Sequence, residues 1–465
     1  MKTLAVCSFL HESAAPNSAT RRFRDRSVFW WTQQRIAQAV GVGETVAIAW
    51  EDQAAAVRAC GDFTVHTIGR RCSLAEMESV TVAQKWADGW RGGLLDTSAF
   101  DKGFDASIIR DLVAGRCDAV LLVDPAAGLV DPTLLDALIN KAAAGTRDCY
   151  FAPAASGLGA MLLKTSMLDR LVSARTHPGR VLHYIPDAPM LDPITSEACL
   201  EVPLAVSRAV GRYTLDSDRQ INMLSTATMP LNGSLLSSNA ESIVQHVAAA
   251  KVPQRFPREV TVEVTSRRAS RPFFAPGTHR TITRADMPLE LFQSICSEIS
   301  SVDDARLCIG GHGDPLLHPD FACLLECCEG LHAVAIETDL IELSEESLHA
   351  ILRTDIDVVS INLPATAPTT YERVMGVDAM ARVVENIKRL LTARQALGRR
   401  VPLIVPRFTK LEMNFEEMEL WHDTWLRALH AATILGPSDF AAQIPDFAVA
   451  DMSPPKRGPC RRIDN

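Results

Sequence analysis

A glycine-rich turn between residues 307 and 321 has the residue types of a ligand site. It reads LCIGGHGDPLLHPDF, so an apolar run ends at Gly310 and Gly311, and Gly313 and Asp314 follow directly. Glycines at the end of a strand let another group come close to the backbone, because they carry no Cβ. The turn therefore leaves two interpretations open, a working ligand site or only the scaffold of one.

Two groups of arginines add positive charge to loops. Their members are Arg267, Arg268 and Arg271 in one loop, and Arg21, Arg22, Arg24 and Arg26 at the start of a predicted helix. Guanidinium groups suit carboxylates and phosphates. Cations at a helix start oppose the helix dipole, so a phosphate partner would help explain the second group, although its loop has no glycine. The alternatives are solvated loops, with the second group paired to Asp25.

The elements that must position these residues follow an α/β pattern. Short apolar runs alternate with helical patterns over the first ~224 residues, which is typical of layered α/β folds. The runs TLAVCSFL, ETVAIAW, DAVLLVD and GAMLLK are predicted strands, and RSVFWWTQQRIAQAV and PTLLDALINKAAA are predicted helices. A stretch rich in Ser, Asn, Pro and Gly then predicts a linker with one helix at 225–257.

The alternation restarts after Pro257. The predicted strands there are VTVEVT, RLCIGG, AVAIET, VVSINL, LIVPRF and ATILGP, each separated from the next by a helical segment. Six such units predict a complete or partial parallel barrel over residues 258–450, with ligands at the carboxyl ends of the strands. Residues 451–465 are predicted to form an exposed tail.

Composition excludes several classes of protein. The 465 residues are too many for one core and predict two or three domains. The net charge of −9 argues against nucleic acid as the main partner, and no apolar run reaches the ~18 residues of a membrane span. The amino-terminal apolar run is short, and the twelve cysteines lack the spacing of a disulfide framework. We therefore expect a cytoplasmic protein with reduced thiols; the oligomeric state stays open.

Four segments of the second half carry a family resemblance. GHGDPLLHPDF, AVAIETDLIELSEES, VVSINLPATAPTTYERVMG and KLEMNFEEMELWHDTW resemble, in order and spacing, segments of radical S-adenosylmethionine (SAM) enzymes that precede a SPASM extension. The resemblance implies a partial (β/α)6 TIM-type barrel. It also implies a SAM-like site at Gly311, Gly313 and Asp314, in which the acid receives the SAM amino group. The tail KRGPCRRIDN resembles the start of a SPASM extension, and the chain ends before further cysteines of such a module.

The cysteines of that family are missing. Its [4Fe–4S] cluster is held by C-x-x-x-C-x-x-C after the first strand, whereas that loop here reads VEVTSRRASRPFFAPGTHR. The three loop arginines would lie where the cluster would be, and we interpret them as an anion site or a solvated loop. No [4Fe–4S] cluster is expected, and SAM binding stays open.

Other donors do not complete a metal site. Cys308 supplies one thiolate, and Cys323, Cys327 and Cys328 are expected to be small buried hydrophobic residues of a helix outside the barrel mouth. His312 and His318 lack a fourth zinc ligand at suitable spacing.

The first half resembles, less specifically, nucleotidyltransferases and glycosyltransferase A-type proteins of the cytidylyltransferase and spore-coat polysaccharide type. The segments are DAVLLVDPAAGLVDPTLLDALI and GRYTLDSDRQINML. The resemblance implies a Rossmann-like domain of the nucleotide-diphospho-sugar transferase type over 1–224. It also implies that Asp124 and Asp216 hold Mg²⁺ on a nucleotide, and Mg²⁺ prefers such hard oxygen ligands.

Three hypotheses for the function follow. The first is a radical SAM-like fusion without its cluster, a pseudoenzyme or binding protein for a small anionic or nucleotide-type ligand in surface-polysaccharide or peptide-modification metabolism. The second is a Mg²⁺-dependent nucleotidyl or nucleotide-sugar transferase that acts through the first half. The third is a radical SAM enzyme with unusual cluster ligation. Whether the protein is an enzyme stays open.

Overall fold

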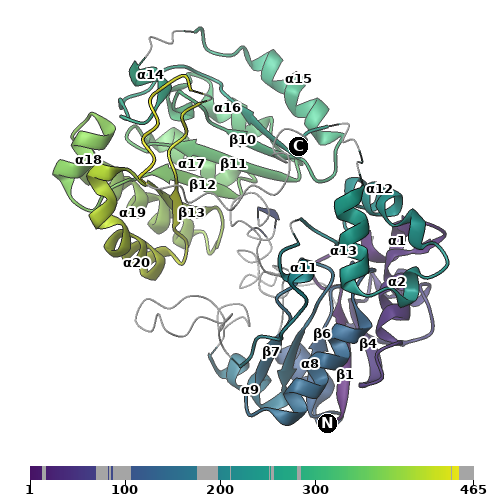
Figure 1. Ribbon diagram of the computed structural model, residues 1–465. Coiled ribbons are helices and arrows are strands. Elements are labelled where there is room, and N and C mark those ends of the chain that lie inside the picture. Colours follow the sequence, from purple (N-terminus) through teal and green to yellow (C-terminus); the bar gives the residue numbers. More distant parts are fainter. Residues whose placement is uncertain are drawn as a thin grey trace. The chain divides into compact units, whose positions relative to one another are not determined.

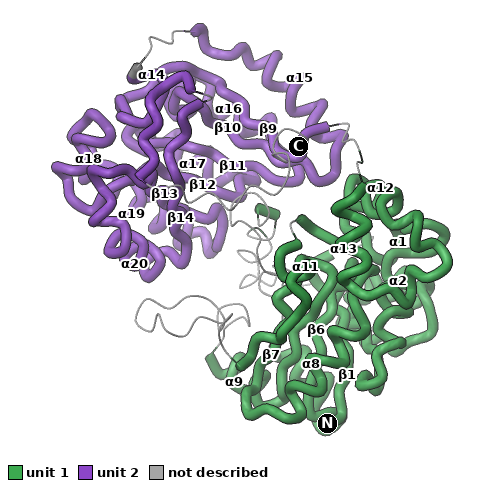
Figure 2. The backbone as a smooth tube through the Cα atoms, viewed as in Figure 1, with its two compact units in different colours: residues 1–253 green, residues 254–465 purple. Residues whose placement is uncertain are grey.

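The computed structural model describes residues 1–12, 17–69, 82, 85–86, 106–174, 197–209, 211–250, 252, 256–279, 284–440 and 442–449. The chain divides into two compact units, Met1–Pro253 and Gln254–Asn465 (Figure 2). The boundary between them lies inside the predicted linker 225–257. No helix among the described residues has the length and apolar character needed to cross a bilayer.

The first unit is built on a six-stranded sheet in the order β5-β4-β1-β6-β8-β7 (Figure 1). Strands β5, β4, β1 and β6 are parallel, whereas β8 runs antiparallel to its neighbours β6 and β7. The strands are β1 (Thr3–Ser8), β4 (Val42–Trp50), β5 (Thr64–Ile68), β6 (Ala119–Leu122), β7 (Cys149–Phe151) and β8 (Met161–Lys164), with a separate hairpin of β2 (Arg22–Phe23) and β3 (Arg26–Ser27).

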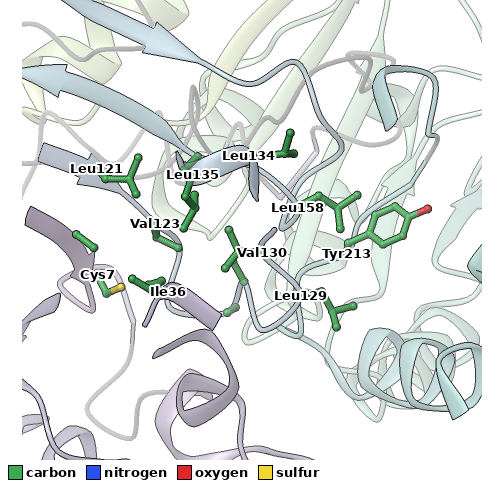
Figure 3. Close-up of a cluster of buried hydrophobic side chains, with 14 of the residues drawn as sticks. Cys7, Ile36, Leu121, Val123, Leu129, Val130, Leu134, Leu135, Leu158 and Tyr213 are labelled. Carbon is green, nitrogen blue, oxygen red and sulfur yellow. The ribbon is translucent and has the colours of Figure 1, made fainter. Parts of the chain in front are cut away.

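Helices cover both faces of this sheet. Alternate strand residues point to opposite faces, so Cys7 and Leu121 join one core cluster and Val6 and Val120 join another. Figure 3 shows the first cluster around Cys7 and Leu121. The helices of the unit are α1 (Asn17–Thr20), α2 (Val28–Ile36), α3 (Ala54–Arg58), α7 (Ala106–Val113), α8 (Pro132–Ala144), α9 (Thr165–Ala174), α11 (Leu204–Ser207), α12 (Asp218–Ala227) and α13 (Ala240–Ala249).

The carboxyl ends of β1 and β6 meet at a switch in the chain's direction across the sheet. After β1 the chain moves to β4 and β5 on one side, and it returns to β6 on the other side of β1. The chain therefore leaves β1 and β6 toward opposite sides of the sheet, and the carboxyl ends of strands at such a switch point are where α/β sheets usually bind ligands.

A buried arginine ties much of the predicted linker to the first unit. Arg35, which lies on α2 and is fully buried, donates to the carbonyls of Val130 (2.5 Å), Leu235, Leu236 (3.0 Å) and Ser238 (2.6 Å). Burial lowers the pKa of Arg35 to about 10, and the charge of a nearby acid, the α8 cap Asp131, partly offsets this effect. The segment from residue 235 to α13 is thus part of the folded unit.

The second unit contains six parallel strands in chain order, β9 to β14 (Figure 1). They are β9 (Glu259–Val262), β10 (Arg306–Ile309), β11 (Ala333–Thr338), β12 (Val358–Asn362), β13 (Leu403–Thr409) and β14 (Thr433–Leu435). The helices are α14 (Pro276–His279), α15 (Leu289–Ser300), α16 (Phe321–Glu326), α17 (Glu345–Arg353), α18 (Pro368–Met375), α19 (Met380–Ala396) and α20 (Met418–Leu429).

The sequence predictions compare well with these elements, with definite exceptions. All six predicted strands of the second half are present, and the predicted helix PTLLDALINKAAA is α8. The prediction omitted β5 and β7. It was also wrong to begin a helix at Arg26, because Arg26 and Ser27 form β3 and the Ser27 hydroxyl caps α2 by accepting from the amide of Trp30. The tail 451–465 lies outside the described residues.

Candidate functional site

One face of the second sheet is apolar and the other carries polar residues. Leu307, Ile336 and Val359 pack into the core together with helix residues such as Phe292. The residues that alternate with them point to the opposite face because of the strand pleat. We call that face the polar face; its members are Glu263, directly after β9, with Cys308, Glu337, Ser360, Asn362 and Arg407.

The pairing register brings members of the polar face together. Glu337 is beside Ser360, and Asn362 is beside Arg407. The Arg407 guanidinium lies 2.5 Å from the Glu337 carboxylate, while the Arg407 Nε is buried without a hydrogen-bond acceptor. Burial, followed by the charge of Glu337, raises the pKa of Cys308 well above its ordinary value. These groups can bind a polar ligand, and Cys308 there is a thiol and not a thiolate.

Arg268 forms the main ion pair at the carboxyl ends of these strands. Its Nε and one terminal nitrogen donate to the two oxygens of Asp339 at 2.7 and 2.5 Å, and its other terminal nitrogen donates to the His312 carbonyl at 3.2 Å. Asp339 also accepts from Ser270 and from Asn362, and its side chain is 1% exposed. Arg268 is therefore held by the protein itself.

Arg268 and Asp339 each favour the charged form of the other. Burial opposes the charged form of Asp339, but the charge of Arg268 and the hydrogen bonds from Arg268, Ser270 and Asn362 together keep the pKa of Asp339 below its ordinary value. Burial likewise opposes the charge on Arg268, and Asp339 reverses this and raises the pKa of Arg268. Tyr371, fully buried, has a hydroxyl without a partner near these charges, and burial followed by Asp339 raises its pKa.

Asp314 is fully engaged by the chain around it. One oxygen accepts from the Leu316 amide (3.1 Å) and so caps the turn Pro315–Leu317, the other accepts from the Asp339 amide (2.9 Å), and the Thr338 hydroxyl reaches both. Burial, followed by the charge of Asp339, raises the pKa of Asp314 to about 6. Asp314, the predicted SAM-binding acid, thus links the turn to the end of β11 by hydrogen bonds.

Other protein atoms lie directly against Gly311 and Gly313 of the turn. A Cβ on Gly313 would lie 1.9 Å from the Thr265 carbonyl oxygen. Gly311 has φ +136°, a region that favours glycine, and a Cβ there would lie 2.9 Å from the Glu263 carboxylate. Glu263 in turn accepts from the His312 amide at 2.7 Å. The glycines let the strands β9 and β10 approach at their ends.

The three loop arginines have separate environments. Arg267 pairs with Asp286 at 2.7 Å, Arg268 pairs with Asp339, and Arg271 is exposed while its amide donates to the Met375 carbonyl. Two of the three charges are thus balanced by carboxylates, which weakens the interpretation of the loop as one anion site.

A carboxyl-terminal segment lies against the same loops. The ring of Phe440 lies 5.8 Å from that of His312, and the ring of Phe447 lies 4.4 Å from that of Phe273. Ile444, between them, is buried. The chain after β14 therefore packs on the loops that follow β9 and β10.

We expect Asp314 to make the stability of the protein depend on pH between about 4 and 6. Its pKa is raised from 3.8 to about 6, so the folded state binds the proton more tightly. This stabilisation, about 3 kcal/mol, is complete below pH 3.8 and is lost as the pH rises through 6. Urea unfolding of the wild type and Asp314→Asn at pH 4.5 and 7 measures the difference; parallel pH dependence would contradict it. Asp339 acts in another window, since its stabilisation is lost only as the pH falls through its lowered pKa.

The residues present do not fit a [4Fe–4S] cluster. The described part of the loop after β9 contains no cysteine, and of the described cysteines in the second unit only Cys308 belongs to the polar face. Its pKa is raised, which opposes thiolate ligation. The ring nitrogens of His318 contact the Met287 carbonyl and the Asp320 amide, which suits its place in the turn. No group of three metal-binding side chains occurs among the residues that the structure describes.

In the first unit the two predicted Mg²⁺ ligands come from adjacent segments. The Leu215 amide donates to the Ala126 carbonyl at 2.8 Å, which ties the segment of Asp216 to the segment of Asp124. Asp124 follows β6 at the switch point and accepts from the Ala126 amide. Asp216 pairs with Arg212, whose side chain is 10% exposed. Mg²⁺ usually takes one or two protein carboxylates beside substrate phosphates, and of these two carboxylates the one of Asp216 is already engaged by Arg212.

The arginines at 21–26 are spread over different partners. Arg21 pairs with Asp218, and Arg24 donates to Asn232 and to Thr228. Arg22 donates to the carbonyl of Asp25, and Arg26 pairs with the Asp25 carboxylate, so the alternative of a basic turn paired with Asp25 describes these two. These contacts weaken the interpretation of the four as one phosphate site.

Sequence reasoning missed several residues of the polar face. The apolar pattern places Glu263, Glu337 and Arg407 in predicted strands and predicts no further role for them. A usable signal was present, because single charged residues interrupt otherwise apolar runs in VTVEVT, AVAIET and LIVPRF. In a parallel strand with two buried faces, such a charge indicates a polar side of the sheet.

The comparisons with known proteins concern overall structure. No protein-family model and no curated protein matches the sequence. Among solved structures, SuiB from Streptococcus suis bound to S-adenosylmethionine is 17% identical, with a TM-score of 0.36, over 49% of this chain and 56% of that chain.

A cytidylyltransferase from Leptospira borgpetersenii is 12% identical, with a TM-score of 0.36, over 54% of this chain and 98% of that one. A third, anSMEcpe with bound AdoMet, is 9% identical, with a TM-score of 0.32, over 39% of this chain and 52% of that one. The chain spans about half the length of the SuiB structures. At these identities and TM-scores, the function has to be argued from the residues themselves.

Proposed function

We propose that the protein is a ligand-binding relative of the radical SAM fold that works without an iron–sulfur cluster. The observation that carries this proposal is the binding of Arg268 to Asp339, Ser270 and the His312 carbonyl. In the resemblance that we described, this loop would hold three thiolates. A guanidinium that is held by four hydrogen bonds to three protein groups stabilises the loop without a metal.

The ligand site of this proposal is the polar face. Glu263 and Glu337 supply carboxylates, and Arg407 supplies a buried Nε that lacks an acceptor. Buried donors without partners are rare, and one that faces other polar groups supports binding of a polar molecule. A small polar ligand with a hydrogen-bond acceptor for Arg407 suits this arrangement.

Anaerobic reconstitution with iron and sulfide tests the proposal. We expect no stoichiometric iron, no brown colour and no 5′-deoxyadenosine from SAM, because three thiolate donors are missing. Stoichiometric iron together with SAM cleavage would overturn the proposal and favour a radical SAM enzyme with unusual ligation. A radical SAM enzyme with its three cysteines, reconstituted in parallel, controls for the procedure.

A second candidate function belongs to the first unit, namely Mg²⁺-dependent binding or transfer of a nucleotide. It is favoured by the position of Asp124 at the switch point between β1 and β6 and by the backbone bond that brings the segment of Asp216 to it. Asp124 and Asp216 would hold Mg²⁺, which would supply positive charge to offset that of the nucleotide phosphates.

We expect CTP or UTP with Mg²⁺ to raise the melting temperature of the protein by about 5–10 °C at a hundredfold excess over Kd. Asp124→Asn should abolish this shift, because it removes one metal ligand. Asp118→Asn is the matched control, since Asp118 precedes the same strand at its opposite end. If neither nucleotide raises the melting temperature, or if Asp124→Asn leaves the shift intact, this second function is refuted.

A further inference from the structure

The deeper members of the polar face are closed to solvent. Cys308 and Ser360 are 5% and 0% exposed, and the Arg407 Nε that the proposed ligand would meet is buried. The whole side chains of Arg407 and Glu337 are 18% and 30% exposed, so these two residues mark the open end of the face. A ligand can therefore reach the Arg407 Nε only if part of the chain around it moves.

The chain after β14 runs between the two edges of the second sheet, at the carboxyl ends of its strands. β14 and β9 are the edge strands, and all six strands are parallel. The chain leaves the carboxyl end of β14, and Phe447 contacts Phe273 in the loop that follows β9 (Figure 1). We call the described part of this chain, residues 436–440 and 442–449, the strap.

Apolar side chains hold the strap on the loops. Phe440 packs on His312, with the ring centroids 5.8 Å apart. Phe447 packs on Phe273 at 4.4 Å, and Ile444, between these contacts in the sequence, is 5% exposed. The other residues described between 442 and 449 are exposed. Segments with few buried side chains open more easily than the core of a domain.

The strap also contains backbone strain. Phe440 and Ala442 have φ values of +51° and +63°, in the left-handed region that favours glycine. Such conformations are unfavourable for other residues and persist only where surrounding contacts hold them. Because the two residues lie next to the contact of Phe440 with His312, loss of that contact would let the backbone turn there and release the strain.

We propose that the strap is a gate over the polar face, which opens by turning at Phe440 and Ala442 and so admits a polar ligand. This inference rests on the proposed function for the identity of the site and concerns access to it. In the closed position Phe440 lies on His312, whose amide donates to the Glu263 carboxylate of the polar face at 2.7 Å. Opening separates the ring contacts of the strap and leaves the strands in place.

The rate at which N-ethylmaleimide modifies Cys308 measures the opening without a ligand. Cys328, which is 3% exposed and packs in the helix-covered core, reports loosening of the whole unit. Both thiols lie in the tryptic peptide 307–353, so fragmentation spectra follow them together. At one pH, we expect the double variant Phe440→Ala and Phe447→Ala to speed the modification of Cys308 about tenfold and to leave that of Cys328 unchanged, because two ring contacts are lost.

Leu397→Ala is the matched control. Leu397 is 60% exposed and lies between α19 and β13, at the amino end of that strand, so its removal should change neither rate. Ala442 tests the turning point in both directions. Ala442→Gly relieves the strain of the closed strap and should slow the modification of Cys308 about fivefold. Ala442→Pro should speed it, because proline cannot adopt a positive φ.

An unchanged rate at Cys308 in the double variant would overturn the proposal. Equal acceleration at Cys308 and Cys328 would overturn it as well, because the whole unit would then have loosened. A faster reaction in Ala442→Gly contradicts the turning point. The experiment contains no iron, sulfide or SAM, so failure of the gate is distinguished from failure of the proposed function, which reconstitution tests.

Discussion

Arg35→Met should lower the free energy of unfolding of the first unit by about 3–5 kcal/mol. Arg35 is fully buried and donates four hydrogen bonds to backbone carbonyls, three of them in the segment 235–238. Methionine fills much of the space but donates nothing, so several buried carbonyls lose their partner. A buried acceptor without a partner costs about 1–3 kcal/mol.

Urea unfolding gives the size of this effect, and hydrogen exchange locates it. In Arg35→Met we expect faster exchange of the amides of residues 235–244, because the arginine no longer holds that segment. Arg58→Ala is the matched control: Arg58 is exposed, is bonded to the Thr67 hydroxyl at 2.8 Å, and should change stability by less than about 0.5 kcal/mol. A loss below 1 kcal/mol in Arg35→Met would show that the segment folds without this arginine.

The second large effect is expected at the pair of Arg268 and Asp339. Arg268→Met and Asp339→Asn should each destabilise the second unit by about 3–5 kcal/mol, because each leaves a buried charge without its partner. The double variant should lose less than the sum of the two. We expect a coupling energy of about 2–3 kcal/mol that favours the folded state.

A double-mutant cycle from urea unfolding measures this coupling. The control cycle uses Arg382 and Glu342, which lie 3.1 Å apart but are more than half exposed, and should give less than about 1 kcal/mol. Equal coupling in the two cycles would mean that Arg268 is an ordinary surface cation. A large coupling would also support the proposed function, in which the ion pair of Arg268 and Asp339 holds the loop.

The two units use charge in a related way. In each unit, an arginine from a predicted anion site binds another part of the same chain: Arg24 donates to Thr228, and Arg268 pairs with Asp339. Desolvated cations must be paired or hydrogen-bonded, and the nearest acceptors are protein groups. The groups still available for a ligand are therefore fewer than the charges in the sequence.

The sequence by itself determined the order of the strands in the second unit and the residue types of the loops between them. The six strands of the second unit appear as short apolar runs, since a parallel strand buried on a helix-covered face must be apolar there. The absence of cysteines from the loop after β9 is read directly from the residues. The switch from one unit to the next was visible as a change in composition, although segment 235–249 belongs to the first unit, where Arg35 holds it.

Only the tertiary structure decided which charges remain for a ligand. Gly313 and Asp314 have the types of a ligand site, yet the first admits the Thr265 carbonyl and the second accepts from Thr338 and Asp339. In the sequence Arg407 is one residue of a predicted strand, whereas the parallel register places it on the same face as Glu337. The physical reason is that local sequence fixes backbone conformation and apolar pattern, whereas the partner of a charge is chosen by contacts between residues far apart in the chain.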